Sequence, residues 1–122
     1  MSNRQKGLDR VRKVKGILQW RGETVEGPGF KPAYNKKTKK MFLMHSDYFG
    51  AFDLMAFSKI KCLYGIQVCD IKNKLRNAKK IYDIAGYGDL WCYMGMRKGF
   101  NKYLVTEADG EMHIELIEEN VK

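Results

Sequence analysis

The sequence predicts one α/β domain over residues 1–122, built as a mixed β-sheet flanked by helices. Three observations support this fold class. Apolar residues recur at three- and four-residue steps in two segments, short apolar runs lie between those segments, and the C-terminal part alternates around an Asp109-Gly110 turn signal. The expected order is α-β-β-β-α-β, followed by a C-terminal hairpin.

Two helices are expected, each from a stripe of apolar residues. The first begins near Leu8 and ends near Gly22, and its stripe comprises Leu8, Val11, Val14, Ile17 and Leu18. The second follows a similar stripe over residues 71–82 and ends at Gly86 or Gly88, since glycine commonly terminates helices.

The segments outside the helices are expected to supply the sheet. Residues 41–57 and 62–69 are apolar and typical of strands that are covered on both faces. Residues 23–27 and 89–97 predict further strands. Residues 27–40 are expected to form a long loop, because two prolines and two glycines interrupt any periodicity there.

The short polar connection between the two apolar segments sets a register. Residues 58–61 favour a tight antiparallel hairpin. If the turn is centred near Ile60, residue 53 lies opposite residue 67, because paired positions in a hairpin add up to a constant. Asp53 and Gln67 then become cross-strand neighbours, roughly 5 Å apart at Cβ. Strand alternation places Cys69 on the face of Gln67, so three polar or reactive groups converge.

These groups predict a metal site. A buried carboxylate is unfavourable unless something pairs with it, and a divalent cation is one solution. Mg²⁺ prefers oxygen ligands, which Asp53, the amide of Gln67 and a backbone carbonyl can supply. Such an ion would polarise a phosphodiester. The alternatives are that Asp53 caps a strand end and that Gln67 is a satisfied buried amide.

The charge balance predicts a polyanionic partner, with nucleic acid as the first candidate. The chain carries 23 Lys and Arg against 14 Asp and Glu, a formal net charge of +9. Basic residues gather in both predicted helices and in the predicted loop, whereas acids gather near the C-terminus. A merely cationic protein is the alternative. The candidate phosphate contacts are Arg10, Arg12, Lys13, Lys36, Lys37, Lys39, Lys40, Lys74, Arg76 and Lys79.

The number of cysteines and the hydropathy of the chain indicate the cellular compartment in which the protein is expected. Cys62, Cys69 and Cys92 are odd in number and form no CxxC pair, which favours reduced thiols in the cytoplasm. No run of about 18 apolar residues occurs, so no membrane association is expected.

Two stretches resemble a known family. The segments GAFDLMAF (50–57) and GIQVCDIKNKLRNAKKI (65–81) resemble the PD-(D/E)xK nuclease superfamily, in particular small Holliday-junction-resolvase-like or phage-type members. Residues 83–99 are similar to the glycine-then-tryptophan strand that follows the second helix in such proteins. The resemblance implies a restriction-endonuclease-like core, a Mg²⁺ or Mn²⁺ cofactor and hydrolysis of DNA.

The resemblance also implies roles for particular residues. Asp53 matches the metal-binding aspartate of the first motif, and Gln67 stands where the second motif has an acid. Cys69 stands at the position of the motif lysine, and Phe52 replaces a proline. Gln67 keeps an oxygen ligand without its charge. Cys69 departs further, because a neutral thiol neither orients water nor offsets negative charge.

Other residues are candidates to compensate for these departures. Lys72 or Lys74, at the start of the second helix, is expected to replace the missing lysine. Asp47 and Asp70 are further candidate ligands, and Asp9 is the sole candidate for an acid on the first helix.

Three functions follow from these observations. The first is a metal-dependent endonuclease that resembles a Holliday junction resolvase. The second is a catalytically weakened nuclease fold that binds nucleic acid or regulates, and the third is a phage-encoded inhibitor that acts through protein contacts. A homodimer and a monomer both remain open. If a dimer forms, Tyr103, Val105 and Ile114 are expected to be exposed on the terminal hairpin and to form its interface.

Overall fold

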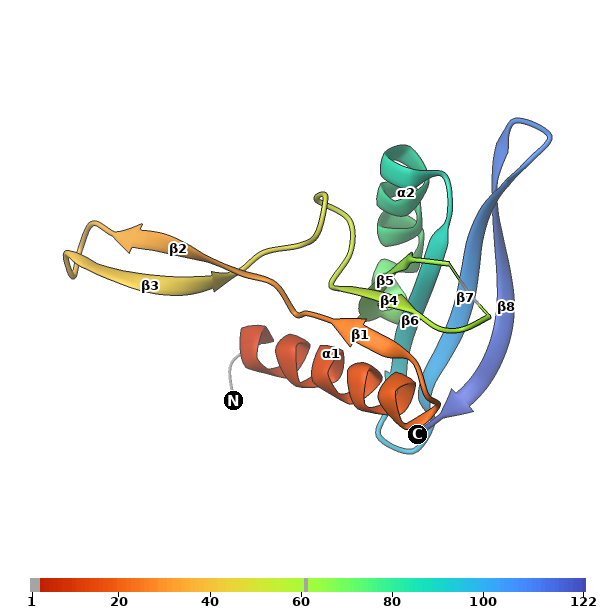
Figure 1. Ribbon diagram of the computed structural model, residues 1–122, viewed down its shortest axis with the longest axis horizontal. Helices are drawn as coiled ribbons and strands as arrows, with labels where there is room; N and C mark the ends of the chain where they lie inside the picture. Colours follow the sequence, from red (N-terminus) through yellow and green to blue (C-terminus); the bar gives the residue numbers. More distant parts are fainter. Residues whose placement is uncertain (1–2, 61) are drawn as a thin grey trace.

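The computed structural model describes residues 3–60 and 62–122, which form a mixed sheet with two helices (Figure 1). The helices are α1 (Asn3–Trp20) and α2 (Lys74–Ala85), and a 3-10 turn, η1 (Ile71–Asn73), precedes α2. The strands are β1 (Thr24–Glu26), β2 (Phe30–Asn35), β3 (Lys40–His45), β4 (Leu54–Phe57), β5 (Tyr64–Asp70), β6 (Gly88–Gly95), β7 (Gly99–Ala108) and β8 (Glu111–Val121).

The main sheet has six strands in the order β1-β4-β5-β6-β7-β8. Neighbouring strands are antiparallel except β5 and β6, which are parallel and are connected through α2. Strands β2 and β3 form a separate two-stranded sheet. The predicted mixed α/β sheet is therefore confirmed, as are both predicted helices. Neither helix in the described part of the chain has the length and apolar character that crossing a bilayer requires.

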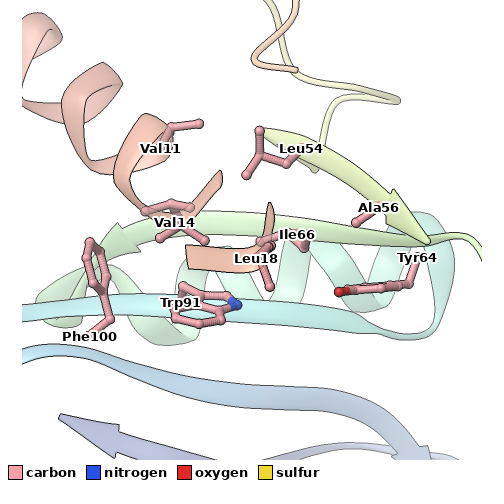
Figure 2. Packing of buried hydrophobic residues seen from close by; sticks show 10 residues of the cluster. Val11, Val14, Leu18, Leu54, Ala56, Tyr64, Ile66, Trp91 and Phe100 are labelled. Carbon is pink, nitrogen blue, oxygen red and sulfur yellow. The ribbon is translucent and has the colours of Figure 1, made fainter. Parts of the chain in front are cut away.

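Helix α1 covers one face of the sheet. Its buried residues Val11, Val14 and Leu18 pack against Ile66 and Trp91, among others (Figure 2). The three helical positions lie at three- and four-residue spacing, so they form the stripe that the sequence predicts. The helix starts earlier than expected, at residue 3.

Helix α2 covers the opposite face. Ala78 and Ile81 of α2 pack with Leu90 of β6 in a second hydrophobic cluster, the α2 cluster. Trp91, the next residue of β6, points to the opposite face and belongs to the cluster packed against α1, the α1 cluster. Gly86 ends the helix at a φ of 77°, and its N–H donates to the carbonyl of Tyr82 at 3.0 Å. The site residues of the central strands therefore lie between two helical layers.

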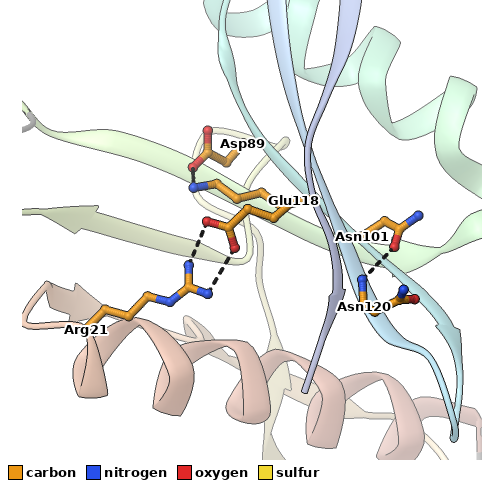
Figure 3. A network of polar contacts seen from close by, with 6 residues as sticks. Arg21, Asp89, Asn101, Glu118 and Asn120 are labelled. Atoms are coloured by element: carbon orange, nitrogen blue, oxygen red, sulfur yellow. Dashed lines mark hydrogen bonds and ion pairs between the residues drawn. The ribbon is translucent and has the colours of Figure 1, made fainter.

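Polar contacts join the end of α1 to the C-terminal hairpin (Figure 3). Arg21, just after α1, pairs with Glu118 of β8 at 2.9 Å. Lys102 of β7 reaches Asp89 of β6 at 3.8 Å, and Asn101 accepts from the N–H of Asn120 at 3.1 Å. These contacts tie the end of α1 to β8 and join the neighbouring strands β6, β7 and β8.

The C-terminal hairpin confirms its turn signal and corrects its predicted surface. Asp109 and Gly110 both have positive φ, 53° and 80°, as a two-residue hairpin turn requires. Tyr103 and Val105, however, are buried in the α2 cluster, and Ile114 is half-buried against it. The predicted exposure of Tyr103 and Val105 is wrong, because α2 covers the face to which they point.

Two further expectations are corrected in residues 27–57. The predicted loop contains β2, which pairs with β3 in an antiparallel hairpin. Proline is tolerated there because a two-stranded ribbon leaves half of its backbone groups unpaired. The predicted continuous strand over residues 41–57 is divided, because β3 belongs to the hairpin and β4 begins only at Leu54. Residues 46–53 form a connection that returns the chain to the main sheet.

Candidate metal and nucleic-acid site

The register of β4 and β5 is the predicted one. Leu54 pairs with Ile66, and Ala56 pairs with Tyr64, so paired positions add up to 120. Asp53 precedes β4 directly, and its N–H donates to the carbonyl of Ile66 at 2.8 Å. The hairpin thus brings Asp53 to the level of β5 at which Gln67 lies.

Asp53 and Gln67 lie on the α2 face of the sheet. The amide of Gln67 donates to Asn77 of α2, and the charge of Lys80 of α2 acts on Asp53, whereas Leu54 and Ile66 belong to the α1 cluster. Both polar side chains are buried, with exposures of 4% and 6%. A carboxylate and an amide therefore share one face beneath α2, as predicted.

The carboxylate of Asp53 lies beside that of Asp47. Burial is the main cause that raises the pKa of Asp53 to about 7, and the negative charge of Asp47 and a hydrogen bond with its side chain add to it. The backbone N–H of Val68 donates a hydrogen bond of 2.9 Å to Oδ2 of Asp53, which lowers the pKa of Asp53. Asp53 and Asp47, here called the carboxylate pair, form a site at which a cation would be stabilised.

Lys80 of α2 is the cation beside the carboxylate pair. Its Nζ lies 3.6 Å from Oδ2 of Asp47, and its charge lowers the pKa of Asp53. Reasoning from the sequence missed Lys80, because its contact depends on how residues 46–53 return to the sheet. Nothing in the local sequence predicts that path.

The two predicted replacement lysines lie elsewhere. Lys72 is exposed on η1. Lys74 points toward β7, with its Nζ 4.8 Å from the ring centre of Tyr103. The structure thus places Lys80, rather than either of these, next to Asp47 and Asp53.

The side-chain amide of Gln67 is hydrogen-bonded through its nitrogen only, among the described residues. Its Nε2 donates to Oδ1 of Asn77 at 3.0 Å, and Nδ2 of Asn77 donates to the carbonyl of Asn73 at 2.9 Å. Within the described chain, Oε1 of Gln67 is buried and has no hydrogen-bond partner. An unpaired buried acceptor costs about 1–3 kcal/mol. The amide nitrogen is thus oriented by α2, and the buried oxygen keeps an unused capacity to accept a hydrogen bond or bind a cation.

A polar cavity of about 250 Å³ opens beside Gln67, between the N-terminal parts of α1 and α2. It is lined by Gly7, Arg10, Gln67, Val68, Cys69, Asp70, Asn73, Arg76 and Asn77. Arg10 forms an ion pair with Asp70 and lies 4.1 Å from the ring centre of Tyr93. Arg76 is exposed, so it is the better placed of the two guanidinium groups to meet a phosphate.

Cys69 is half-buried against Cys92. The two sulfur atoms lie 3.8 Å apart on adjacent strands. The hydrogen bond between the two thiols lowers the pKa of Cys69, and this effect outweighs burial and the charges of Asp70 and Asp53, which raise it. The thiol lines the polar cavity, but it supplies no fixed positive charge.

The oxygen atoms present fit a hard divalent cation. Among the residues that the structure describes, no group of three or more His, Cys, Asp or Glu side chains could hold a metal. The carboxylate pair supplies two acidic side chains, however, and Gln67 adds an unpartnered oxygen. Mg²⁺ is commonly bound by one or two carboxylates and several waters, so the carboxylate pair is of the type that could contribute ligands to such an ion.

The other acidic candidates are engaged elsewhere. Asp70 pairs with Arg10, as described above. Asp9 is exposed on α1, accepts a hydrogen bond from Gln5 at 2.8 Å and lines a different hollow, with Met96.

The predicted phosphate contacts divide into two groups. Lys74 and Arg10 are half-buried against aromatic rings, so they are less free to move toward a ligand. The remaining candidates are exposed: Arg12, Lys13, Lys36, Lys37, Lys39, Lys40, Arg76 and Lys79. They lie on both helices and on the β2–β3 hairpin, in keeping with a charged surface that spans all three.

No protein-family model, curated protein or solved structure matches the chain. The candidate site consists of the carboxylate pair, Lys80, the amide of Gln67 and the polar cavity that Gln67 lines.

Proposed function

We propose that this protein is a metal-dependent endonuclease of the PD-(D/E)xK type, similar to Holliday junction resolvases, that hydrolyses phosphodiesters in DNA. One observation carries the proposal. Asp53, directly before β4, lies beside the carboxylate of Asp47 and accepts from the N–H of Val68 next to Gln67, and among the described residues the buried oxygen of Gln67 has no hydrogen-bond partner.

The arrangement of the main sheet supports the proposal. If the β2–β3 hairpin is treated as an insertion, the remaining elements follow the order α1, β1, β4, β5, α2, β6 and then a hairpin. This is the order that the resemblance to the nuclease superfamily implies. Asp53 directly precedes the second strand and Gln67 lies on the third, in keeping with the positions that the resemblance gives to the two motifs.

The residues present suggest a division of labour. Asp53, Asp47 and Gln67 would hold Mg²⁺ or Mn²⁺, which when bound supplies Lewis-acid polarisation of the phosphodiester. Arg76 at the cavity would orient the phosphate, because a guanidinium matches its oxygens. Lys80 would offset negative charge near the carboxylate pair, the role that the resemblance gives to the motif lysine.

The pKa of Asp53 implies a pH dependence for this site. At pH values below about 7 the buried carboxyl group holds a proton, which competes with a cation for the same oxygen atoms. Cation binding and cleavage should therefore increase as the pH rises through 7.

A second candidate function is a nuclease fold that binds nucleic acid without cleaving it. Cys69 favours this function, because the neutral thiol contacts Cys92 where the motif has a lysine. The basic surface would remain useful to such a protein. The two functions differ in cleavage and share nucleic-acid binding.

A cleavage assay separates these functions. Branched, duplex and single-stranded DNA are incubated with Mg²⁺ and either the native chain, Asp53→Ala or Asp83→Ala, an exposed aspartate on α2 that serves as the control. The proposal expects Mg²⁺-dependent cutting that Asp53→Ala abolishes and Asp83→Ala preserves. Salt-sensitive binding without cutting would support the second function instead. If no nucleic acid binds at low salt, both functions fail and an inhibitor that acts through protein contacts gains support.

A further inference from the structure

The β2–β3 hairpin, residues 30–45, extends away from the body of the molecule as an arm (Figure 1). Its six cross-strand pairs run from Phe30 with His45 to Asn35 with Lys40. A two-stranded ribbon by itself is at best marginally stable in water. An arm of this kind gains stability from a surface against which it can lie.

The arm is strongly basic. It contains five lysines and no aspartate or glutamate. All five are exposed: Lys31, Lys36, Lys37, Lys39 and Lys40. At the tip, Oδ1 of Asn35 accepts from the N–H groups of Lys37 and Thr38 at 2.9 and 3.3 Å, which fixes the turn. The arm therefore presents a fixed tip of positive charge.

One face of the arm is also apolar. Strand alternation and the register place five side chains on it: Phe30, Pro32, Tyr34, Met41 and Leu43. All five are exposed, and Met41 and Leu43 are 65% and 68% accessible. Phe42 lies on the opposite face of the same strand and is 40% accessible. A partner must therefore offer both negative charge and a surface that apolar groups can contact.

The arm is rooted at the candidate site. The N–H of Ser46 donates to the carbonyl of Gly29 at 2.8 Å, and the chain then continues to Asp47. A Cβ atom at Gly27 would lie 2.8 Å from the carbonyl oxygen of Asp53, so the backbones approach closely there. Whatever the arm binds is thereby positioned relative to the carboxylate pair.

We propose that the arm enters the major groove of B-form duplex DNA, an inference that rests on the proposed function only in taking nucleic acid as the partner. The major groove, about 12 Å wide, admits a two-stranded ribbon. The lysines contact phosphates on either side, and the apolar face meets base edges, including thymine methyl groups. The deep, narrow major groove of duplex RNA excludes such a ribbon, so the substrate class is duplex DNA.

The test compares affinities of the full chain for three probes of matched sequence: duplex DNA, duplex RNA and single-stranded DNA, by fluorescence anisotropy. Met41→Glu places a charge on the apolar face, and Phe42→Glu places the same charge on the opposite face of the same strand. We expect Met41→Glu to weaken duplex DNA binding about tenfold or more, and Phe42→Glu to have a much smaller effect. Duplex RNA should bind at least about tenfold more weakly than duplex DNA.

The salt dependence provides a second readout. Lys37→Ala should reduce the slope of log affinity against log salt by about 0.9, because one phosphate contact is lost. An unchanged slope for Lys37→Ala, equal effects of the two glutamate variants, or equal affinity for duplex RNA would overturn the inference. So would sedimentation that shows Met41→Glu converting a dimer into the 14.2 kDa monomer with unchanged DNA affinity, because the face would then bind a second copy.

The arm and the candidate site can fail separately. Asp53→Ala should abolish cleavage and leave duplex affinity near the native value, whereas Met41→Glu should lower affinity. Binding that depends on Met41 without any cleavage would retain the arm and reject the nuclease. Cleavage that depends on Asp53 while Met41→Glu leaves affinity unchanged would retain the nuclease and reject the arm.

Discussion

Oδ2 of Asp53 and the backbone N–H of Val68 are joined by a hydrogen bond of 2.9 Å across the β4–β5 pair. Even with this bond, which favours the ionised form, burial and Asp47 raise the pKa of Asp53 to about 7. The folded chain thus holds a proton on Asp53 more tightly than an unfolded chain, in which the ordinary pKa is 3.8.

Stability should therefore fall as the pH rises between about 4 and 7, and level off above 7. Asp53→Asn removes the titrating group and keeps an acceptor for Val68. From pH 5 to pH 8, the native chain should lose about 2–3 kcal/mol more of its free energy of unfolding than Asp53→Asn does, as measured by urea titration. If both proteins show the same pH dependence, Asp53 does not have a raised pKa.

Gln67 should set the strength of cation binding. At pH 8, millimolar Mg²⁺ should raise the thermal midpoint of the native chain, because a cation that binds only the folded state stabilises it. Gln67→Glu adds a negative charge and should enlarge this rise, whereas Gln67→Met keeps the volume, removes the oxygen and should reduce it. Differential scanning fluorimetry with and without Mg²⁺ measures the effect. An equal response of all three proteins would remove Gln67 from the site.

Lys80 should matter for cleavage, and its neighbour Lys79 should not. Lys80→Met removes the cation 3.6 Å from Asp47 and is expected to lower the cleavage rate about 100-fold. Lys79→Met removes an exposed charge and should alter binding slightly without changing the rate at saturating DNA. Single-turnover kinetics distinguish rate from affinity. Similar rates for both variants would exclude the role given to Lys80.

Cys69→Lys should increase cleavage. The substitution places a lysine, the residue that the proposed nuclease motif has at this position, at the wall of the polar cavity, near the negative charges of Asp70 and Asp53. The matched variant Cys69→Met adds length without charge and should give no gain. An increase of about tenfold over the native rate is expected from a charge placed close to the reacting phosphate. A folded Cys69→Lys protein without any gain would argue that position 69 lies outside the catalytic geometry.

The ring of Phe52, the residue directly before Asp53, packs against Gly65 of β5. A Cβ atom at Gly65 would lie 2.4 Å from that ring, so Gly65→Ala must displace Phe52 and should destabilise the fold by about 1–3 kcal/mol. Gly16→Ala, in α1, meets nothing within 4 Å and should stabilise by about 0.5–1 kcal/mol. Urea unfolding of the two variants provides the comparison. A neutral Gly65→Ala would show that Phe52 is not packed as described.

The sequence allowed the central register to be predicted because the information is local. The short polar connection and the apolar runs on either side of it predict the pairing of Leu54 with Ile66 and of Ala56 with Tyr64, which the structure shows. The turn at Asp109-Gly110 and the helix end at Gly86 were predictable for the same reason, since each depends on a backbone conformation that its own residue type favours.

Features that depend on distant packing could not be predicted in this way. The ion pair of Lys80 with Asp47 requires the chain to return from the arm to the sheet. The burial of Tyr103 and Val105 requires α2 to lie on their face. The arm was mistaken for a loop because its prolines and glycines are turn formers, and because a ribbon without its own core lacks the buried pattern of a strand.

Isothermal titration of Mn²⁺ into the native chain and into Asp53→Asn at pH 6 tests the central claim most directly. We expect one site in the native chain, with release of nearly one proton per ion, because Asp53 is protonated at that pH. Asp53→Asn should lose both the site and the proton release. Mn²⁺ binding of equal affinity in the two proteins, or no binding in the native chain up to pH 8, would contradict it.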